Sequence, residues 1–139
     1  MTYLIPARRI FELAAAMYAA GFGLWVWMVM RVYGAEPLYW TTLTLDEQRH
    51  FAWFLIGFGL IHSFGIWLNG RWMYSPFIRV IGMAGMCWLI FTLATHTSNR
   101  LSTGAYNYAF VSALLFTGLL SAIADARTAL MKRRISWTL

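Results

Sequence analysis

The sequence predicts an all-α integral membrane protein, a four-helix bundle in which each helix crosses the bilayer. Of its 139 residues, 60% are hydrophobic and only 12% are charged, about half the charged share of a typical soluble domain. The apolar residues also gather in four long runs, each close to the roughly 20 residues that a helix needs to span the hydrocarbon. These two observations predict one four-span transmembrane domain over residues 1–139.

Helices are the expected spanning structure because backbone groups in lipid must find hydrogen-bond partners within their own segment. The runs also lack the strict alternation of barrel strands. The first run is longer than the apolar region of a signal peptide, and no cleavage site follows it, so we expect it to be retained. We place the helices at about 8–32, 45–69, 76–97 and 103–127, with a basic C-terminal tail over 128–139.

The first helix carries one acidic residue, Glu12, close to its start. Burying an ionisable group in a membrane is costly, so each such residue is a candidate for function. The simpler interpretation is that Glu12 reaches the lipid headgroups or pairs with Arg8 or Arg9.

The second helix begins with a capping box, in which Thr44 is the N-cap and Glu47 occupies the third helical position. The loop before it, residues 31–43, is expected to lie along the membrane interface. His62 is the ionisable group within the apolar run, roughly 10 Å from Asn69 at 1.5 Å per residue. A neutral histidine can donate to a carbonyl or a serine of a facing helix, and a proton relay, a ligand site or a gate are the alternatives. Glu12 is its only carboxylate neighbour at similar depth in the first two helices.

A compact basic segment, NGRWMYSPFIR, separates the second and third runs. Asn and Gly tolerate the left-handed conformation that closes a helix, while Ser75 followed by Pro76 is typical of an N-cap and a first helical position. Trp and Tyr favour the membrane interface. We expect a tight cytoplasmic turn held at the headgroups, with docking of a partner as the alternative. The candidate residues for this turn are Asn69, Gly70, Arg71, Trp72, Tyr74, Ser75, Pro76 and Arg79.

Two helices carry small residues at every fourth position, which allows close approach of another helix in lipid. The partner can be a helix of the same chain or a second subunit. The first helix has Ala15, Ala19 and Gly23, and the fourth has Ala105, Ala109, Ala113, Thr117 and Ser121.

The basic residues predict the orientation. Eight lie on the side of the termini and the 69–76 turn, and three on the other. The positive-inside rule places the richer side in the cytoplasm, so both termini are expected there. The eight are Arg8, Arg9, Arg71, Arg79, Arg127, Lys132, Arg133 and Arg134, and the three are Arg31, Arg49 and Arg100. The net charge of +6 is therefore a topology signal, and we expect no nucleic-acid partner.

The sequence offers little catalytic or cofactor chemistry. A hydrolase triad, a His-Glu-x-x-His zinc motif and a phosphate-binding glycine loop are absent. Cys87 is the single cysteine, so no disulfide can form within one chain. His50 and His96 lie equally far in sequence from Met73, the symmetry that a haem held by two histidines between the second and third helices requires. Our expectation is a protein that is not an enzyme, without cofactor, metal or small-molecule substrate, with haem binding as the least favoured alternative.

The run IHSFGIWLNGRWMYSPFIRVIG resembles a pattern in small multispanning membrane proteins encoded by phages and prophages. The shared features are a histidine in one span, then Asn-Gly-Arg-Trp, Ser-Pro, and an arginine early in the next span. The later stretch YNYAF…SAIADARTAL is more weakly similar. Such proteins resemble holins, and the resemblance implies no catalytic residues.

Two hypotheses for the function follow. In the first, the protein oligomerises in the bacterial inner membrane and permeabilises it as holins do. Its polar face would come from Thr117, Ser121, Asp125 and His62. In the second, it is a non-enzymatic accessory subunit that binds another membrane protein or a cytoplasmic partner through the Arg71–Tyr74 turn, without making a pore. In the first hypothesis, the basic tail, Lys132, Arg133 and Arg134, would hold to the anionic lipid surface.

Overall fold

The computed structural model describes residues 7–38, 41–68, 72, 74–97 and 103–136. Across these residues the chain forms four helices: α1 (Ala7–Tyr33), α2 (Leu45–Trp67), α3 (Ser75–Thr95) and α4 (Thr103–Ser136). Each helix contains a stretch that is long and apolar enough to cross a membrane. The predicted all-helical class and its four apolar helices are therefore confirmed.

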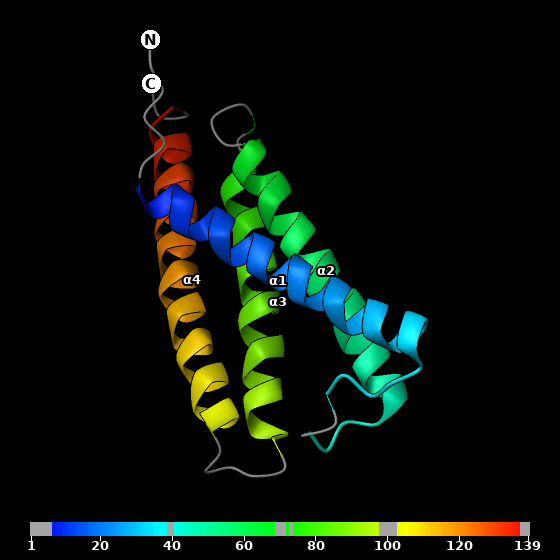
Figure 1. Ribbon diagram of the computed structural model, residues 1–139. Helices are drawn as coiled ribbons and strands as arrows, with labels where there is room; N and C mark the ends of the chain where they lie inside the picture. Colours follow the sequence, from blue (N-terminus) through cyan, green and yellow to red (C-terminus); the bar gives the residue numbers. More distant parts are fainter. Residues whose placement is uncertain (1–6, 39–40, 69–71, 73, 98–102, 137–139) are drawn as a thin grey trace.

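The helices run alternately up and down (Figure 1). α3 packs along α4 on one side and along α2 on the other, and α1 packs mainly against α2. Figure 1 shows α1 running diagonally across the other helices, from beside α4 toward the start of α2. We call the end that holds the starts of α1 and α3 and the ends of α2 and α4 the proximal end, and the opposite end the distal end.

Two predicted boundaries are wrong. α4 does not end near residue 127 before a separate tail, because the helix continues to Ser136. Ser75 is not the N-cap of α3: Tyr74 holds that position without a side-chain cap, Ser75 is already helical and buried, and Pro76 follows within the first turn. Proline is tolerated there because the N–H groups of the first turn have no partner within the helix.

The capping box of α2 is confirmed. The Thr44 hydroxyl accepts a hydrogen bond from the Glu47 N–H at 3.4 Å, and the Glu47 carboxylate accepts one from the Thr44 N–H at 2.7 Å. The predicted closure of the helix by Asn69 and Gly70 lies outside the described residues. Within them, α2 ends at Trp67, with Leu68 as its C-cap.

The distal loop between α1 and α2 turns into the bundle. Gly34, with φ of +60°, occupies the left-handed conformation that ends α1. Pro37 and Leu38 are then buried, Leu38 completely. A short antiparallel bridge joins Thr41 to Thr97 beyond α3. Pro37 and Leu38 therefore pack against the bundle, while residues 31–36 are exposed, and the placement of this loop along the membrane interface stays a prediction.

The side chain of Gln48 holds this loop in place. It is almost completely buried, its Oε1 accepts from the Leu38 N–H at 3.2 Å, and its Nε2 donates to the Leu43 carbonyl at 3.0 Å. We expect Gln48→Leu to lower the free energy of unfolding by about 1–3 kcal/mol, because it leaves buried backbone groups without partners. Thr42→Val, which removes an exposed hydroxyl bond to His96, is the control. Unfolding in mixed micelles measures both, and equal effects would contradict the assigned role.

The core is apolar and tightly packed where α1 meets α2. A Cβ placed on Gly23 would lie 2.7 Å from the Ala52 carbonyl oxygen, and one on Gly59 would lie 2.9 Å from the Ala16 carbonyl oxygen. Ala19 of the predicted small-residue stripe is fully buried. The stripe of α1 therefore serves contact within the chain.

Candidate functional site

Five ionisable side chains meet at the proximal end, and they come from all four helices. They are Arg9 and Glu12 of α1, His62 of α2, Arg79 of α3 and Asp125 of α4. We call them the proximal cluster. Glu12, His62 and Arg79 lie four or five residues inside the proximal ends of their helices, about 6–8 Å at 1.5 Å per residue.

Arg79 is the centre of the proximal cluster. Its side chain is fully buried, and all three guanidinium nitrogens donate to carboxylates. Nη2 lies 2.7 and 2.6 Å from the two oxygens of Glu12, and Nε lies 3.0 Å from Glu12 Oε2. Nη1 lies 2.9 Å from Asp125 Oδ2. This bidentate geometry is the strong form of an arginine–carboxylate pair, and it joins α3 to α1 and to α4.

Arg9 closes the cluster on the side of the helix ends. Its Nη1 lies 3.2 Å from Glu12 Oε2 and its Nη2 lies 3.0 Å from Asp125 Oδ2. The side chain is 11% exposed, and that of Asp125 is 21% exposed. Two carboxylates thus face two guanidinium groups, and with a neutral His62 the formal charge of the cluster is zero. Burial of charges in a medium of low dielectric constant is costly unless each charge has a partner. In this cluster each charge has one.

His62 contacts the cluster from α2. Its side chain is fully buried, and Nδ1 lies 2.9 Å from the backbone carbonyl oxygen of Arg79. A carbonyl can only accept, so Nδ1 carries the hydrogen. The other ring nitrogen, Nε2, lies 3.9 Å from Glu12 Oε2 and has no hydrogen-bond partner. The predicted donation from His62 to a carbonyl of a facing helix is therefore confirmed.

Two glycines allow α2 and α3 to approach at this level. A Cβ on Gly65 would lie 2.8 Å from Arg79 Cγ, and one on Gly82 would lie 2.6 Å from His62 Cβ and 2.8 Å from its Cα. Side chains at positions 65 and 82 would keep α2 and α3 apart, and the His62 imidazole could then not reach the Arg79 carbonyl. The glycines therefore position the cluster from both helices.

The other predicted residues have different outcomes in the structure. The pairing of Glu12 with Arg9 is confirmed. The assignment of Arg79 to a turn that contacts a partner is wrong, because its side chain is buried among carboxylates. Trp72 and Tyr74 are about half exposed beside this end, whereas Asn69, Gly70 and Arg71 lie outside the described residues. Lys132, Arg133 and Arg134 are helical, but their side chains lie outside the description.

Sequence reasoning placed Glu12 near Arg9 and His62, but it missed the full cluster because it assigned Arg79 to the turn and Asp125 to a polar face. Glu12 and Arg79 lie within the first and third apolar runs, and Asp125 directly follows the fourth run, which ends at Ala124. Matching opposite charges by depth would have indicated a pairing. The choice of partners still depends on how the helices turn toward each other.

The histidines of the haem hypothesis lie at the distal end. Both His50 and His96 are exposed, and His96 Nδ1 already lies 2.9 Å from the Thr92 carbonyl oxygen. Over the part of the chain that is described, no group of three or more His, Cys, Asp or Glu side chains is placed to hold a metal ion.

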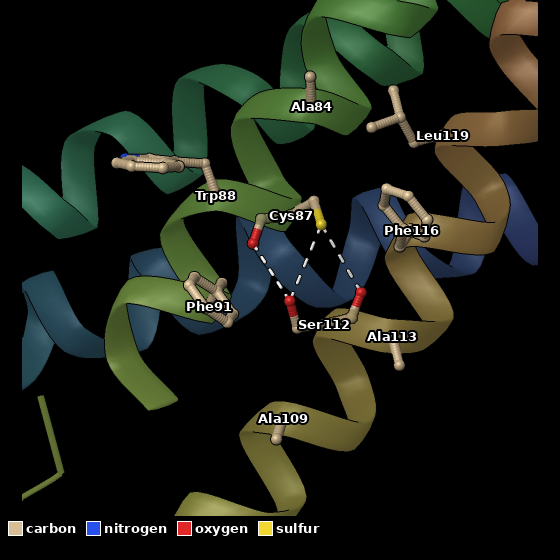
Figure 2. Close-up of a pocket in the computed structure, with 9 residues that line it drawn as sticks. All are labelled: Ala84, Cys87, Trp88, Phe91, Ala109, Ser112, Ala113, Phe116 and Leu119. Atoms are coloured by element: carbon tan, nitrogen blue, oxygen red, sulfur yellow. Dashed lines mark hydrogen bonds between the residues drawn. The ribbon is translucent and has the colours of Figure 1, made fainter. Parts of the chain in front are cut away.

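A second feature is an apolar groove of about 520 Å³ between α3 and α4 (Figure 2). At its floor, the Cys87 thiol donates to the Ser112 carbonyl at 3.6 Å, and the Ser112 hydroxyl donates to the Cys87 carbonyl at 3.4 Å. Exposed Trp88, Phe91 and Phe116 flank it. Its α4 wall includes Ala109 and Ala113, both exposed. The small-residue stripe of α4 is therefore open to the surroundings here, unlike that of α1.

Comparison with known proteins gives no assignment: no protein-family model, curated protein or solved structure shows a significant match to this chain.

Proposed function

We propose that this protein is a non-enzymatic membrane protein that self-associates in the bacterial inner membrane and permeabilises it in a holin-like way. The observation that carries the proposal is the open stripe of α4. Ala109, Ala113 and Thr117 are exposed, and the Thr117 hydroxyl is satisfied by its own helix through the Leu114 carbonyl at 2.7 Å. In lipid, small residues at this spacing favour helix contact.

A second copy is the occupant that fits this face. The same stripe on two chains makes a self-complementary contact about a twofold axis, the commonest symmetry of oligomers. The adjoining groove accepts larger side chains from the facing copy, and its flanking aromatic residues enlarge the contact. The lipid bilayer is the remaining partner in the proposal, and neither a small-molecule substrate nor a cofactor enters it.

The orientation remains the one proposed from the basic residues, with the proximal end in the cytoplasm. Arg9 and Arg79 are neutralised by Glu12 and Asp125 in the proximal cluster. Setting these two aside reduces the proximal count from eight basic residues to six, against three at the distal side. The proximal side still carries the excess of basic residues, so the proposal of cytoplasmic termini is retained.

The bundle constrains how permeabilisation could occur. The expectation that His62 and Asp125 contribute to an outward polar face does not hold for this bundle, because His62 is fully buried and Asp125 is bound to two arginines. A water-filled lesion would therefore form between copies, or would require α1 to separate from α3 and α4.

Induced expression in bacteria tests the function. We expect abrupt loss of membrane potential and release of a co-expressed endolysin from the cytoplasm. A potential-sensitive dye and an assay of endolysin in the medium measure the two effects. Unchanged potential and viability, with the protein present in the membrane, would reject the permeabilising role.

Self-association has its own prediction. Ala113→Leu should weaken association by about tenfold or more, because the larger side chain keeps the helices apart. Ala14→Leu, at an exposed alanine of α1, is the matched control. Energy transfer between labelled chains in vesicles, measured against the protein-to-lipid ratio, gives the affinity. Equal affinity for the two variants would place the contact elsewhere.

An accessory membrane subunit is the second candidate. It is favoured by the proximal cluster, which ties all four helices into one closed unit, and by the exposure of Trp72 and Tyr74 at the same end. If this candidate is correct, induction leaves the membrane intact, and replacement of both aromatic residues by alanine prevents capture of the partner.

A further inference from the structure

The proximal cluster contains one polar atom that its ion pairs leave unused. His62 Nε2 is buried without a hydrogen-bond partner and lies 3.9 Å from Glu12 Oε2. Because Nδ1 carries the hydrogen, Nε2 presents a lone pair to a carboxylate oxygen, and two acceptors face each other. A proton between them would convert this unfavourable contact into a charge-assisted hydrogen bond.

We propose that His62 Nε2 and Glu12 Oε2 form a proton-binding site, and that a proton bound there competes with Arg9 for Glu12. This inference concerns the cluster alone and does not depend on self-association or permeabilisation.

The contacts of Glu12 Oε2 indicate which of its present hydrogen-bond donors a protonated His62 would displace. This oxygen accepts from Arg79 Nη2 at 2.6 Å, from Arg79 Nε at 3.0 Å and from Arg9 Nη1 at 3.2 Å. The bond with Arg9 is the longest, and Arg9 is the more exposed of the two arginines. A protonated His62 Nε2 would need to come about 1 Å closer to Glu12 Oε2 to reach hydrogen-bond distance. This approach displaces the hydrogen bond from Arg9 to Glu12.

The formal charges favour replacement of Arg9 by the proton on His62 over addition of the proton with Arg9 still in place. The groups that face His62 are Arg9 and Glu12 from α1 and Arg79 from α3, and Asp125 of α4 completes the cluster. With neutral His62 their formal charges sum to zero. A proton on His62 raises the sum to +1, and movement of Arg9 toward the proximal surface returns the buried part to zero. The two binding events are linked: the Arg9–Glu12 pair lowers the proton affinity of His62 by the same factor by which the bound proton lowers the affinity of Glu12 for Arg9.

The direct test is the protonation state of His62 in lipid vesicles. The chain carries two exposed histidines besides His62, so we would use the His50→Gln/His96→Gln protein labelled with ¹⁵N in its remaining ring. At about pH 8 we expect hydrogen on Nδ1 and a bare Nε2, and on lowering the pH toward about 4 we expect both nitrogens to become protonated. A hydrogen on Nε2 at the higher pH, or a neutral ring throughout, would overturn the proposal.

Two variants in the same background test the roles of the neighbours. Arg9→Gln should raise the proton affinity of His62 about tenfold, one pH unit in the midpoint, because the competing cation is gone. Glu12→Gln should lower it by a similar factor, because the accepting carboxylate is lost. Arg49→Gln, which removes an exposed arginine of α2, should leave the midpoint unchanged. If Arg9→Gln and Arg49→Gln give the same midpoint, the competition with Arg9 is rejected. If Glu12→Gln fails to fold, the measurement without these substitutions still decides whether the proton site exists.

Discussion

Replacement of Arg79 by leucine is expected to lower the free energy of unfolding by about 3–5 kcal/mol, the cost of leaving buried charges without a partner. Arg79 donates to both oxygens of Glu12 and to Asp125. Without it, two carboxylates share Arg9 alone, and the cluster holds one uncompensated negative charge. Titration with a denaturing detergent, followed by circular dichroism in mixed micelles, measures the loss.

The matched control is Arg49→Leu. Arg49 also pairs with a carboxylate, Asp46, at 3.2 Å, but both side chains are well exposed. Exposed pairs contribute about 0–1 kcal/mol, so the control should stay close to the wild-type protein. An Arg79→Leu protein as stable as this control would show that the cluster contributes little to the bundle.

Two further substitutions separate charge from geometry at this position. Arg79→Lys keeps the positive charge but loses the planar fork that binds both Glu12 oxygens, so we expect an intermediate loss. The double variant Glu12→Leu/Arg79→Leu removes one charge of each sign and leaves Arg9 with Asp125. It should be more stable than Arg79→Leu alone, because replacing a whole buried pair by apolar side chains is often nearly neutral.

The second large effect is expected at Gly82. An alanine there places its Cβ 2.6 Å from His62 Cβ and 2.8 Å from the His62 backbone nitrogen and Cα. Backbone atoms cannot move aside as a flexible side chain can, so α2 and α3 must separate. We expect Gly82→Ala to cost about 1–3 kcal/mol, as for overpacked cores. The same unfolding titration measures it.

Gly57→Ala is the control for this substitution. Gly57 also lies within a helix, but a Cβ there meets nothing within 4 Å. Alanine has the higher helix propensity, so this variant should be as stable as the wild-type protein or slightly more stable. If both alanine variants unfold alike, the close approach of α2 and α3 at the proximal cluster is not what requires glycine at position 82.

The sequence determined the elements of this protein. The lengths of the apolar runs, the low share of charged residues and the capping box at Thr44 depend on local chemistry, and they predicted four helices with α2 starting at the correct residue. The small-residue spacing also predicted two contact faces; that of α1 packs within the chain, whereas that of α4 is exposed and its contact stays a prediction. The exact end of α4 was predicted less well, because the basic stretch after Arg127 continues as helix to Ser136.

Only the tertiary structure decided which side chains meet. Arg79 and Glu12 are 67 positions apart in the chain, and Arg9 and Asp125 are 116 apart. Their pairing depends on the direction of α1 across the bundle (Figure 1) and on the close approach that Gly65 and Gly82 allow. Helix formation follows from hydrogen bonds within one segment, whereas partners between helices depend on how each helix is rotated and crossed. For that reason Arg79 looked like a surface residue in the sequence and is the buried centre of the cluster in the fold.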